Sequence, residues 1–142
     1  MSIELSFIEI NNKKVIKFTD VEFQYDIILR RIILWVSIEF DIFEVHQRME
    51  FEEADFLYLR DGLEKIINQE NKRMLFKPMI DQRLSLEFCF NDNKNVELKG
   101  VIFNSMFTGE LKFRFEIRIV QVQSLINDLD NLIIIGRKKA TN

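Results

Sequence analysis

The feature that most constrains the fold of this chain is a strict alternation of apolar and charged residues after Gly109. One side of this run holds five apolar residues and the other holds four charged ones: Leu111, Phe113, Phe115, Ile117 and Ile119 against Lys112, Arg114, Glu116 and Arg118. A two-residue period of this length is typical of a strand with one buried face and one face in water. We therefore expect an antiparallel sheet with a charged outer side.

Six further segments are predicted to be strands from alternating or continuous apolar residues bounded by polar turns. With the run after Gly109 they make about seven strands: residues 3–7, 15–25, 32–45, 74–77, 84–90, 96–102 and 111–119. The polar stretch 91–95 is predicted to be the turn of a hairpin. The strand-to-strand connections are too short for parallel crossovers, so the sheet should be mostly antiparallel.

Two segments change to a helical period. Residues 52–68 place apolar side chains three and four positions apart and begin with acids, which the helix dipole favours at that end. The last helix is predicted to be capped by Ser124 and closed by Gly136 as the C′ residue, with 137–142 as a frayed basic tail. The whole chain, 1–142, is therefore predicted to be one α+β domain in which two helices pack on the sheet.

Composition narrows the range of functions. The net charge is −3, which disfavours nucleic acid as a partner. A single cysteine excludes an internal disulfide and suits a reducing compartment. The first residues do not resemble a signal peptide, and the most apolar window is too short and too charged to cross a membrane. The expected location is cytoplasmic, without a membrane partner.

Residues able to carry out catalysis are few. His46 is the only histidine and Cys89 the only cysteine, so a multi-histidine metal site cannot form within one chain. A thiol–imidazole pair of these two is conceivable, but Cys89 lies mid-strand between phenylalanines, where cysteine usually packs as a small apolar residue. The sequence therefore predicts no catalytic residue, no metal site, no cofactor and no enzyme activity.

Acidic residues gather between positions 39 and 65, where nine acids face three bases. A solvated helix start is the simpler explanation of this cluster. The alternative is a binding surface for a basic partner, because an excess of one charge accelerates association with its opposite. The predicted partner-binding residues are Glu44, Glu50, Glu52, Glu53 and Asp55.

Several segments together resemble the WapI-type immunity proteins of bacterial polymorphic toxin systems. The likeness runs over most of the chain and is carried by packing and capping patterns. These are Leu34-Trp35-Val36, the helix 56–63, Leu75-Phe76-Lys77-Pro78, the strand 84–88, and the junction from Phe115-Glu116-Ile117 to Gln123-Ser124-Leu125 with its closing helix. The resemblance implies a small cytosolic protein that binds a cognate toxin domain and blocks it stoichiometrically.

The acidic segment suits a toxin that is a nuclease with a basic cleft. Two other functions remain open. One is a small-molecule-binding or sensor domain with a pocket between the sheet and the helix 52–68, lined by phenylalanines and Trp35, although these side chains are better explained as core residues. The other is a weak hydrolase that uses the acids between Glu50 and Asp55. The protein is expected to be a monomer or a weak homodimer.

Overall fold

The chain repeats one order of elements twice, four strands followed by a helix. The computed structural model describes residues 3–91 and 95–140. The first half runs β1 (Leu5–Ile8), β2 (Lys14–Tyr25), β3 (Arg30–Phe40), β4 (Phe43–Glu52) and α1 (Glu53–Ile67). The second half runs β5 (Arg73–Phe76), β6 (Leu84–Phe90), β7 (Asn95–Phe103), β8 (Glu110–Arg118) and α2 (Ile119–Ala140).

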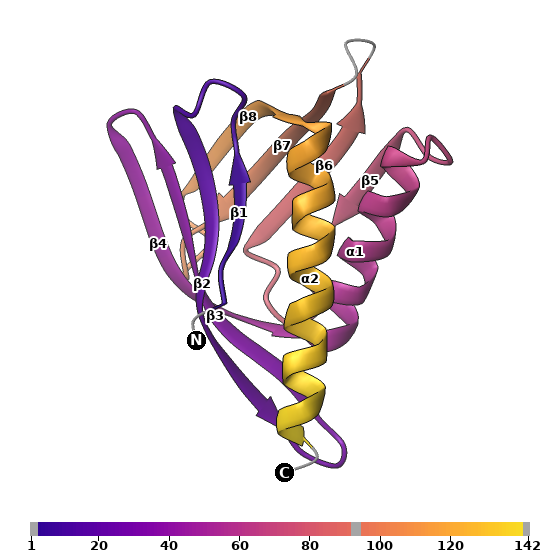
Figure 1. Cartoon of the computed structure of the whole chain (residues 1–142). Helices are drawn as coiled ribbons and strands as arrows, with labels where there is room; N and C mark the ends of the chain where they lie inside the picture. Colours follow the sequence, from indigo (N-terminus) through magenta and orange to yellow (C-terminus); the bar gives the residue numbers. More distant parts are fainter. Residues whose placement is uncertain (1–2, 92–94, 141–142) are drawn as a thin grey trace.

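Each half forms its own antiparallel sheet with the strands in sequence order (Figure 1). The first sheet is β1-β2-β3-β4 and the second is β5-β6-β7-β8. The α+β class and the antiparallel pairing predicted from the sequence are confirmed, although they are divided between two sheets. The hairpin of β6 and β7 is also confirmed, with Phe90 opposite Val96. Three residues of its predicted turn, 92–94, lie outside the described residues.

The predicted strand 32–45 is in fact a hairpin. β3 ends at Phe40 and β4 begins at Phe43, so only two residues connect them, and Asp41 adopts a positive φ of 47°. Aspartate tolerates this left-handed conformation better than most residues. Because the neighbouring residue, Ile42, is apolar, the sequence does not show the polar pattern that usually indicates a turn. Residues 3–91 and 95–140 consequently form eight strands, where the sequence suggested about seven.

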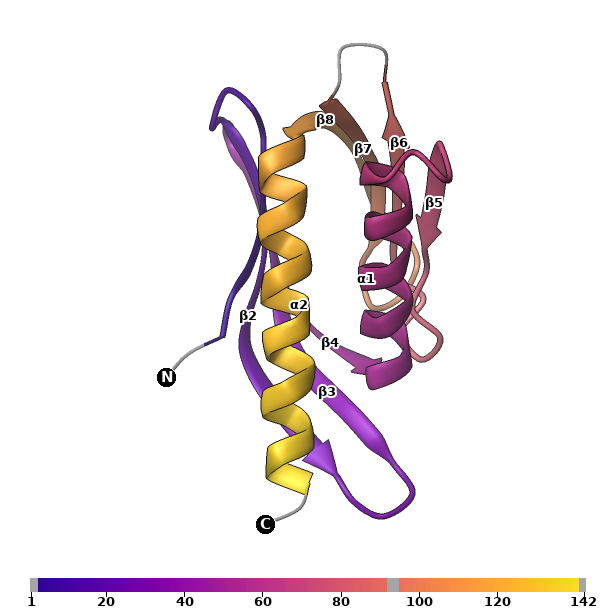
Figure 2. The same ribbon diagram turned by 45° about the vertical axis from the view of Figure 1, so that its right-hand side comes forward.

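Both helices lie against the inner faces of the sheets, next to one another (Figures 1 and 2). The core between the helices and the sheets combines aliphatic side chains with a group of phenylalanine rings. Phe18 from β2, Phe51 from β4 and Phe56 from α1 are fully buried, and the rings of Phe51 and Phe56 lie 5.1 Å apart. Offset ring pairs at such distances add to the stabilisation from apolar burial. The rings of Phe7 in β1 and Phe88 in β6 lie 6.1 Å apart, so the core is continuous between the two halves.

A side-chain clasp joins the sheets at the edge of β4. Arg83, between β5 and β6, donates from one guanidinium nitrogen to the Arg48 carbonyl at 2.9 Å and from another to the Gln47 side chain at 3.0 Å. Asp81 in the same loop pairs with Arg83 at 2.6 Å. Burial alone would raise the pKa of Asp81, but the hydrogen bonds and charge of Arg83 outweigh it and lower that pKa.

The last helix differs from its prediction at both ends. α2 begins at Ile119, directly after β8, and not at Ser124. It continues through Gly136 to Ala140, so residues 137–140 belong to the helix, and 141–142 lie outside the described residues. Gly136 is not a C′ residue with a positive φ. Instead it is buried where the helix approaches β2: a Cβ there would stand 2.6 Å from the Phe23 ring.

Candidate functional site

The five acids predicted to bind a partner do not share one surface. Glu53 and Asp55 are each only 5 % exposed. Glu53 accepts hydrogen bonds from Arg30 at 3.2 Å and from Arg137 at 2.9 Å, so it ties β3 and α1 to the end of α2. Burial alone would raise the pKa of Glu53, but these two guanidinium groups hold it below its usual value. The buried Tyr25 hydroxyl lies beside this carboxylate, although without a hydrogen bond of good geometry.

Asp55 caps the first helix. One carboxylate oxygen accepts the backbone N–H of Glu52 at 2.9 Å, and the other accepts the backbone N–H of Met79 at 3.2 Å. These contacts satisfy donors at the start of α1 and fix the loop after β5. Glu53 and Asp55 are therefore structural, and Glu52 is half-buried at the helix start. Sequence reasoning placed them on the surface because Arg137, which pairs with Glu53, and Met79, which donates to Asp55, lie far away in the chain.

Glu44 and Glu50 do lie on a surface, the outer face of the first sheet. Residues on this face of β3 alternate with the buried positions Leu34, Val36 and Ile38. Trp35 therefore points outward and is half-buried, whereas the sequence placed it in the core. Its ring stacks on His46 of β4, with centroids 4.3 Å apart and planes within 3°.

Hydrogen bonds and ion pairs fix the surroundings of this stacked pair. The Ser37 hydroxyl lies 2.7 Å from Nδ1 of His46. Arg48 reaches across β3 to Glu22 of β2, with an N–O distance of 2.9 Å. We call this surface the Trp35 face. Its centre is Trp35, His46 and Arg48, with the buried Ile33 beside them, and its rim is Glu22, Glu39, Glu44 and Glu50.

Two acids of the rim oppose one another. Glu39 and Glu44 are cross-strand partners in β3 and β4, and both are exposed. Like charges placed directly opposite destabilise a sheet. Within the described part of the chain, neither carboxylate has an ion-pair partner, whereas Glu22 pairs with Arg48 and Glu50 pairs with Arg31 at 3.7 Å. The surplus negative charge of the face is therefore concentrated at this pair.

A small notch borders the Trp35 face. It has a volume of about 330 Å³, and Ile33, Arg48 and Glu50 of the first sheet form one side of it. Ile80 and the clasp residues form the other side. Because the clasp is fixed to the edge of β4, the notch has a rigid wall. It adds a concave feature to a face that is otherwise a flat sheet surface.

A larger cleft of about 1110 Å³ lies between the turn of β3 and β4 and the second sheet. Its apolar part includes Phe40, Phe43 and Leu75. Its polar part includes four cations and two acids: Lys14, Lys99, Lys112, Arg114, Asp41 and Glu87. Lys112 and Arg114, which were predicted to face water from β8, form part of this lining.

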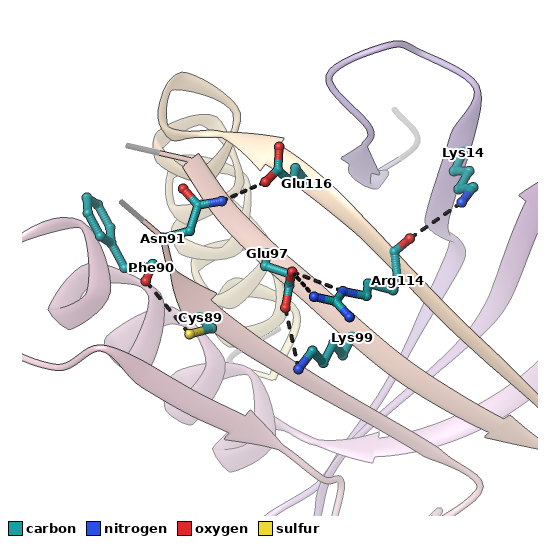
Figure 3. Close-up of polar contacts among 8 residues, drawn as sticks. All are labelled: Lys14, Cys89, Phe90, Asn91, Glu97, Lys99, Arg114 and Glu116. Carbon is teal, nitrogen blue, oxygen red and sulfur yellow. Dashed lines mark hydrogen bonds and ion pairs between the residues drawn. The ribbon is translucent and has the colours of Figure 1, made fainter. Parts of the chain in front are cut away.

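The cations of this cleft are largely neutralised by their neighbours (Figure 3). Glu97 accepts from Arg114 at 2.8 Å and lies 3.5 Å from Lys99. Lys112 lies 3.6 Å from Glu110. Lys14 instead approaches the Arg114 carbonyl at 3.5 Å. The cleft therefore has little surplus charge with which to select a ligand, and we regard the Trp35 face as the better candidate.

The structure does not bring the conceivable catalytic pair together. His46 belongs to the first sheet and contacts Trp35 and Ser37. Cys89 belongs to the second sheet, where its thiol approaches the Phe90 carbonyl at 3.7 Å (Figure 3). Across residues 3–91 and 95–140, no group of three or more His, Cys, Asp or Glu residues is placed to hold a metal ion.

The region proposed for a small-molecule pocket is packed at its centre, and a pocket of about 450 Å³ lies beside α1, lined in part by Tyr58, Phe76 and Met79. Phe51, Phe56 and Phe76 are buried beneath α1, and their rings contact one another at centroid distances of 5.1 to 6.4 Å. Trp35, which was expected to line that pocket, is on the opposite face of the sheet. As for membranes, none of the helices in the described ranges is long and apolar enough to cross one.

Comparisons with known proteins find similarity of fold only. No protein-family model and no curated protein matches the sequence. The plant transcriptional regulator PBF-2 is similar in structure, with a TM-score of 0.51 and 10 % identity over 94 % of this chain and 81 % of that one. MRP1/MRP2 of "trypanosoma bruciei" has a TM-score of 0.44 and 8 % identity over 92 % of this chain and 81 % of that one. At such identities PBF-2 shares the arrangement of elements, and function has to be argued from the surface.

Proposed function

We propose that this protein is an immunity-type inhibitor that binds a basic toxin domain through the Trp35 face and blocks it stoichiometrically. The observation that carries this proposal is the stacked pair of Trp35 and His46 at the centre of a charged rim. Tryptophan and arginine are enriched among residues that dominate binding energy, and such residues lie centrally, with a rim that excludes water. Trp35 and Arg48 have this arrangement.

The opposed acids of the rim also support a binding role. Glu39 and Glu44 repel one another in the free protein, which costs a few tenths of a kcal/mol up to about 1 kcal/mol. A basic side chain of a partner would remove this repulsion on binding. The same charges would attract a basic domain over a distance and orient it. The partner is therefore expected to be a basic protein, as a nuclease with a phosphate-binding cleft would be.

PBF-2 is described as a transcriptional regulator, which raises nucleic acid as an alternative partner. The Trp35 face argues against it. Its unpaired charges, Glu39 and Glu44, are negative and would repel phosphate groups, which supply most of the affinity in nucleic-acid binding. The resemblance to immunity proteins and the charge of this face both point instead to a protein partner.

The proposal is tested with the toxin domain encoded beside the gene, co-expressed with this protein while growth rescue and complex formation are measured. Trp35→Ala should weaken the complex by about 2 kcal/mol or more, roughly thirty-fold in Kd. Tyr58→Ala is the control, because Tyr58 is an exposed aromatic residue on α1, away from the face. Loss of binding in the control but not in Trp35→Ala would refute the assignment.

Glu44→Lys separates binding from folding. The new lysine would lie opposite Glu39, so the free protein should become slightly more stable, by a few tenths of a kcal/mol. Binding to a basic partner should weaken, mainly through a slower association rate that depends on salt. A variant that is more stable and still binds and protects as well as wild type would show that the acidic rim has no part in recognition.

A further inference from the structure

The turn between β2 and β3 exposes three aliphatic residues in a row. Ile27 is fully exposed, Ile28 is 88 % exposed and Leu29 is 42 % exposed. The two strands are the longest in the protein, and their turn protrudes beyond the rest of the first sheet (Figures 1 and 2). Single exposed aliphatic residues are common, but a consecutive run at a protruding tip is unusual unless it contacts something.

This turn is held in one conformation. A carboxylate oxygen of Asp26 accepts the backbone N–H groups of Ile28 at 2.7 Å and Leu29 at 2.6 Å. The backbone N–H of Asp26 also donates to the Leu29 carbonyl at 2.9 Å. The isoleucines are therefore presented by a preformed turn, and binding through them needs little further ordering of the backbone.

Basic residues surround this apolar tip. Arg30 and Arg31 follow it in the chain, and the C-terminal end of α2 lies beside it (Figure 2). That end contributes the consecutive cations Arg137, Lys138 and Lys139, all exposed. We call the tip residues 27–29 together with these five cations the basic tip.

Contacts within the protein fix α2 next to the turn. Arg30 and Arg137 share the buried Glu53 carboxylate, yet each side chain remains about half exposed. Lys139 lies over the Phe23 ring, 5.4 Å from its centroid. The acids in this region are Asp26, Glu50, Glu52 and Glu53. Glu50 pairs with Arg31, and Glu52 lies opposite Arg31 in the neighbouring strand. Five cations against four acids leave a net charge of +1 around the basic tip, on a chain whose net charge is −3.

We propose that the basic tip docks on the surface of an anionic lipid bilayer, with Ile27 and Ile28 entering the headgroup boundary. Peripheral membrane binding combines apolar side chains that insert shallowly with basic residues that meet acidic headgroups. A convex tip suits a fluid surface, which can close around it. Such docking needs no spanning helix, and it departs from the expectation that no membrane is involved. It is independent of toxin binding by the Trp35 face.

The test is co-sedimentation of the purified protein with vesicles of phosphatidylcholine and phosphatidylserine, with pure phosphatidylcholine vesicles as the neutral surface. We expect binding to the anionic vesicles only, weakening as sodium chloride is added. The double variant Ile27→Ser, Ile28→Ser should reduce partitioning by about tenfold or more, because it removes the apolar insertion. The double variant Lys138→Gln, Lys139→Gln should bind the anionic vesicles more weakly, and its binding should depend less on the sodium chloride concentration.

Ile42→Ser is the matched control, because Ile42 is 90 % exposed in the turn at the opposite end of β3. It should bind vesicles like wild type. Absence of binding to anionic vesicles overturns the proposal, as does binding that the Ile27 and Ile28 substitutions leave unchanged. The other occupant to test is a second copy of the chain, and sedimentation velocity measures this. If wild type is a dimer and the Ile27 and Ile28 substitutions dissociate it, the tip is a dimer interface and the proposal is overturned.

Discussion

Gly136 marks the closest approach of α2 to the first sheet, and replacing it with alanine tests how tight that contact is. Two effects oppose one another. Alanine is favoured over glycine inside a helix by about 1 kcal/mol. Against this, the new Cβ would stand 2.6 Å from Cε1 of Phe23 and 2.9 Å from the Tyr25 hydroxyl oxygen. Forcing extra volume into a packed site typically costs about 1–3 kcal/mol.

The aromatic rings have little room to yield. Phe23 and Tyr25 pack edge to face with centroids 5.5 Å apart, and Lys139 covers the Phe23 ring. We therefore expect the clash to exceed the gain in helix propensity, so that Gly136→Ala lowers the free energy of unfolding by about 1–2 kcal/mol. For a chain of this size the melting temperature should fall by roughly 3–8 °C.

Gly62→Ala is the control, because Gly62 also lies inside a helix with a close neighbour. Its new Cβ would meet the flexible side chain of Met74, 2.5 Å from Cγ, and methionine can change rotamer. This variant should be neutral or stabilised by up to about 1 kcal/mol. Urea unfolding followed by circular dichroism measures both. Equal stabilities, or a more stable Gly136→Ala, would refute a tight contact between α2 and β2.

Two further predictions concern buried acids. Asp55→Ala removes the acceptor for two backbone N–H groups and should lower the free energy of unfolding by about 1–2 kcal/mol in the same urea assay. The pKa of Asp81 is lowered in the folded protein by Arg83. The Asp81 carboxylate therefore contributes its full stabilisation to the fold above about pH 4, and this contribution is lost as the pH falls through the lowered pKa. Asp81→Asn should therefore lose less stability than wild type between neutral and acidic pH, and an equally steep loss would contradict this role.

Local patterns predicted most strands well, because alternation is a property of neighbouring residues. β8 is the clearest case, since every second side chain from Leu111 to Ile117 faces inward, as predicted. The division between β3 and β4 was missed because Asp41 and Ile42 form a turn without glycine or proline. The start of α2 was missed because the chain passes from strand to helix without a turn, so no Ser, Thr, Asp or Asn precedes Ile119 as a capping residue.

The candidate site could be predicted only in part. The sequence indicated an acidic region, and Glu44 and Glu50 do lie on an exposed face. It could not show that Glu53 is buried, because the cation nearest to it, Arg137, lies 84 positions later. Trp35 was assigned to the core because its segment is apolar on both sides. Its outward position depends on the register of β3 against its neighbours, which no local pattern encodes.

The clasp of Arg83 on β4 has a consequence for how the protein is made. β4 is complete at Glu52, but the residues that cover its free edge are synthesised about thirty positions later. At translation rates of about 5–20 residues per second, the edge of β4 stays uncovered for several seconds. An uncovered edge can recruit strands from other chains. A fragment that stops after α1 should therefore aggregate. During synthesis, the first half of the nascent chain should be the part that chaperones need to protect.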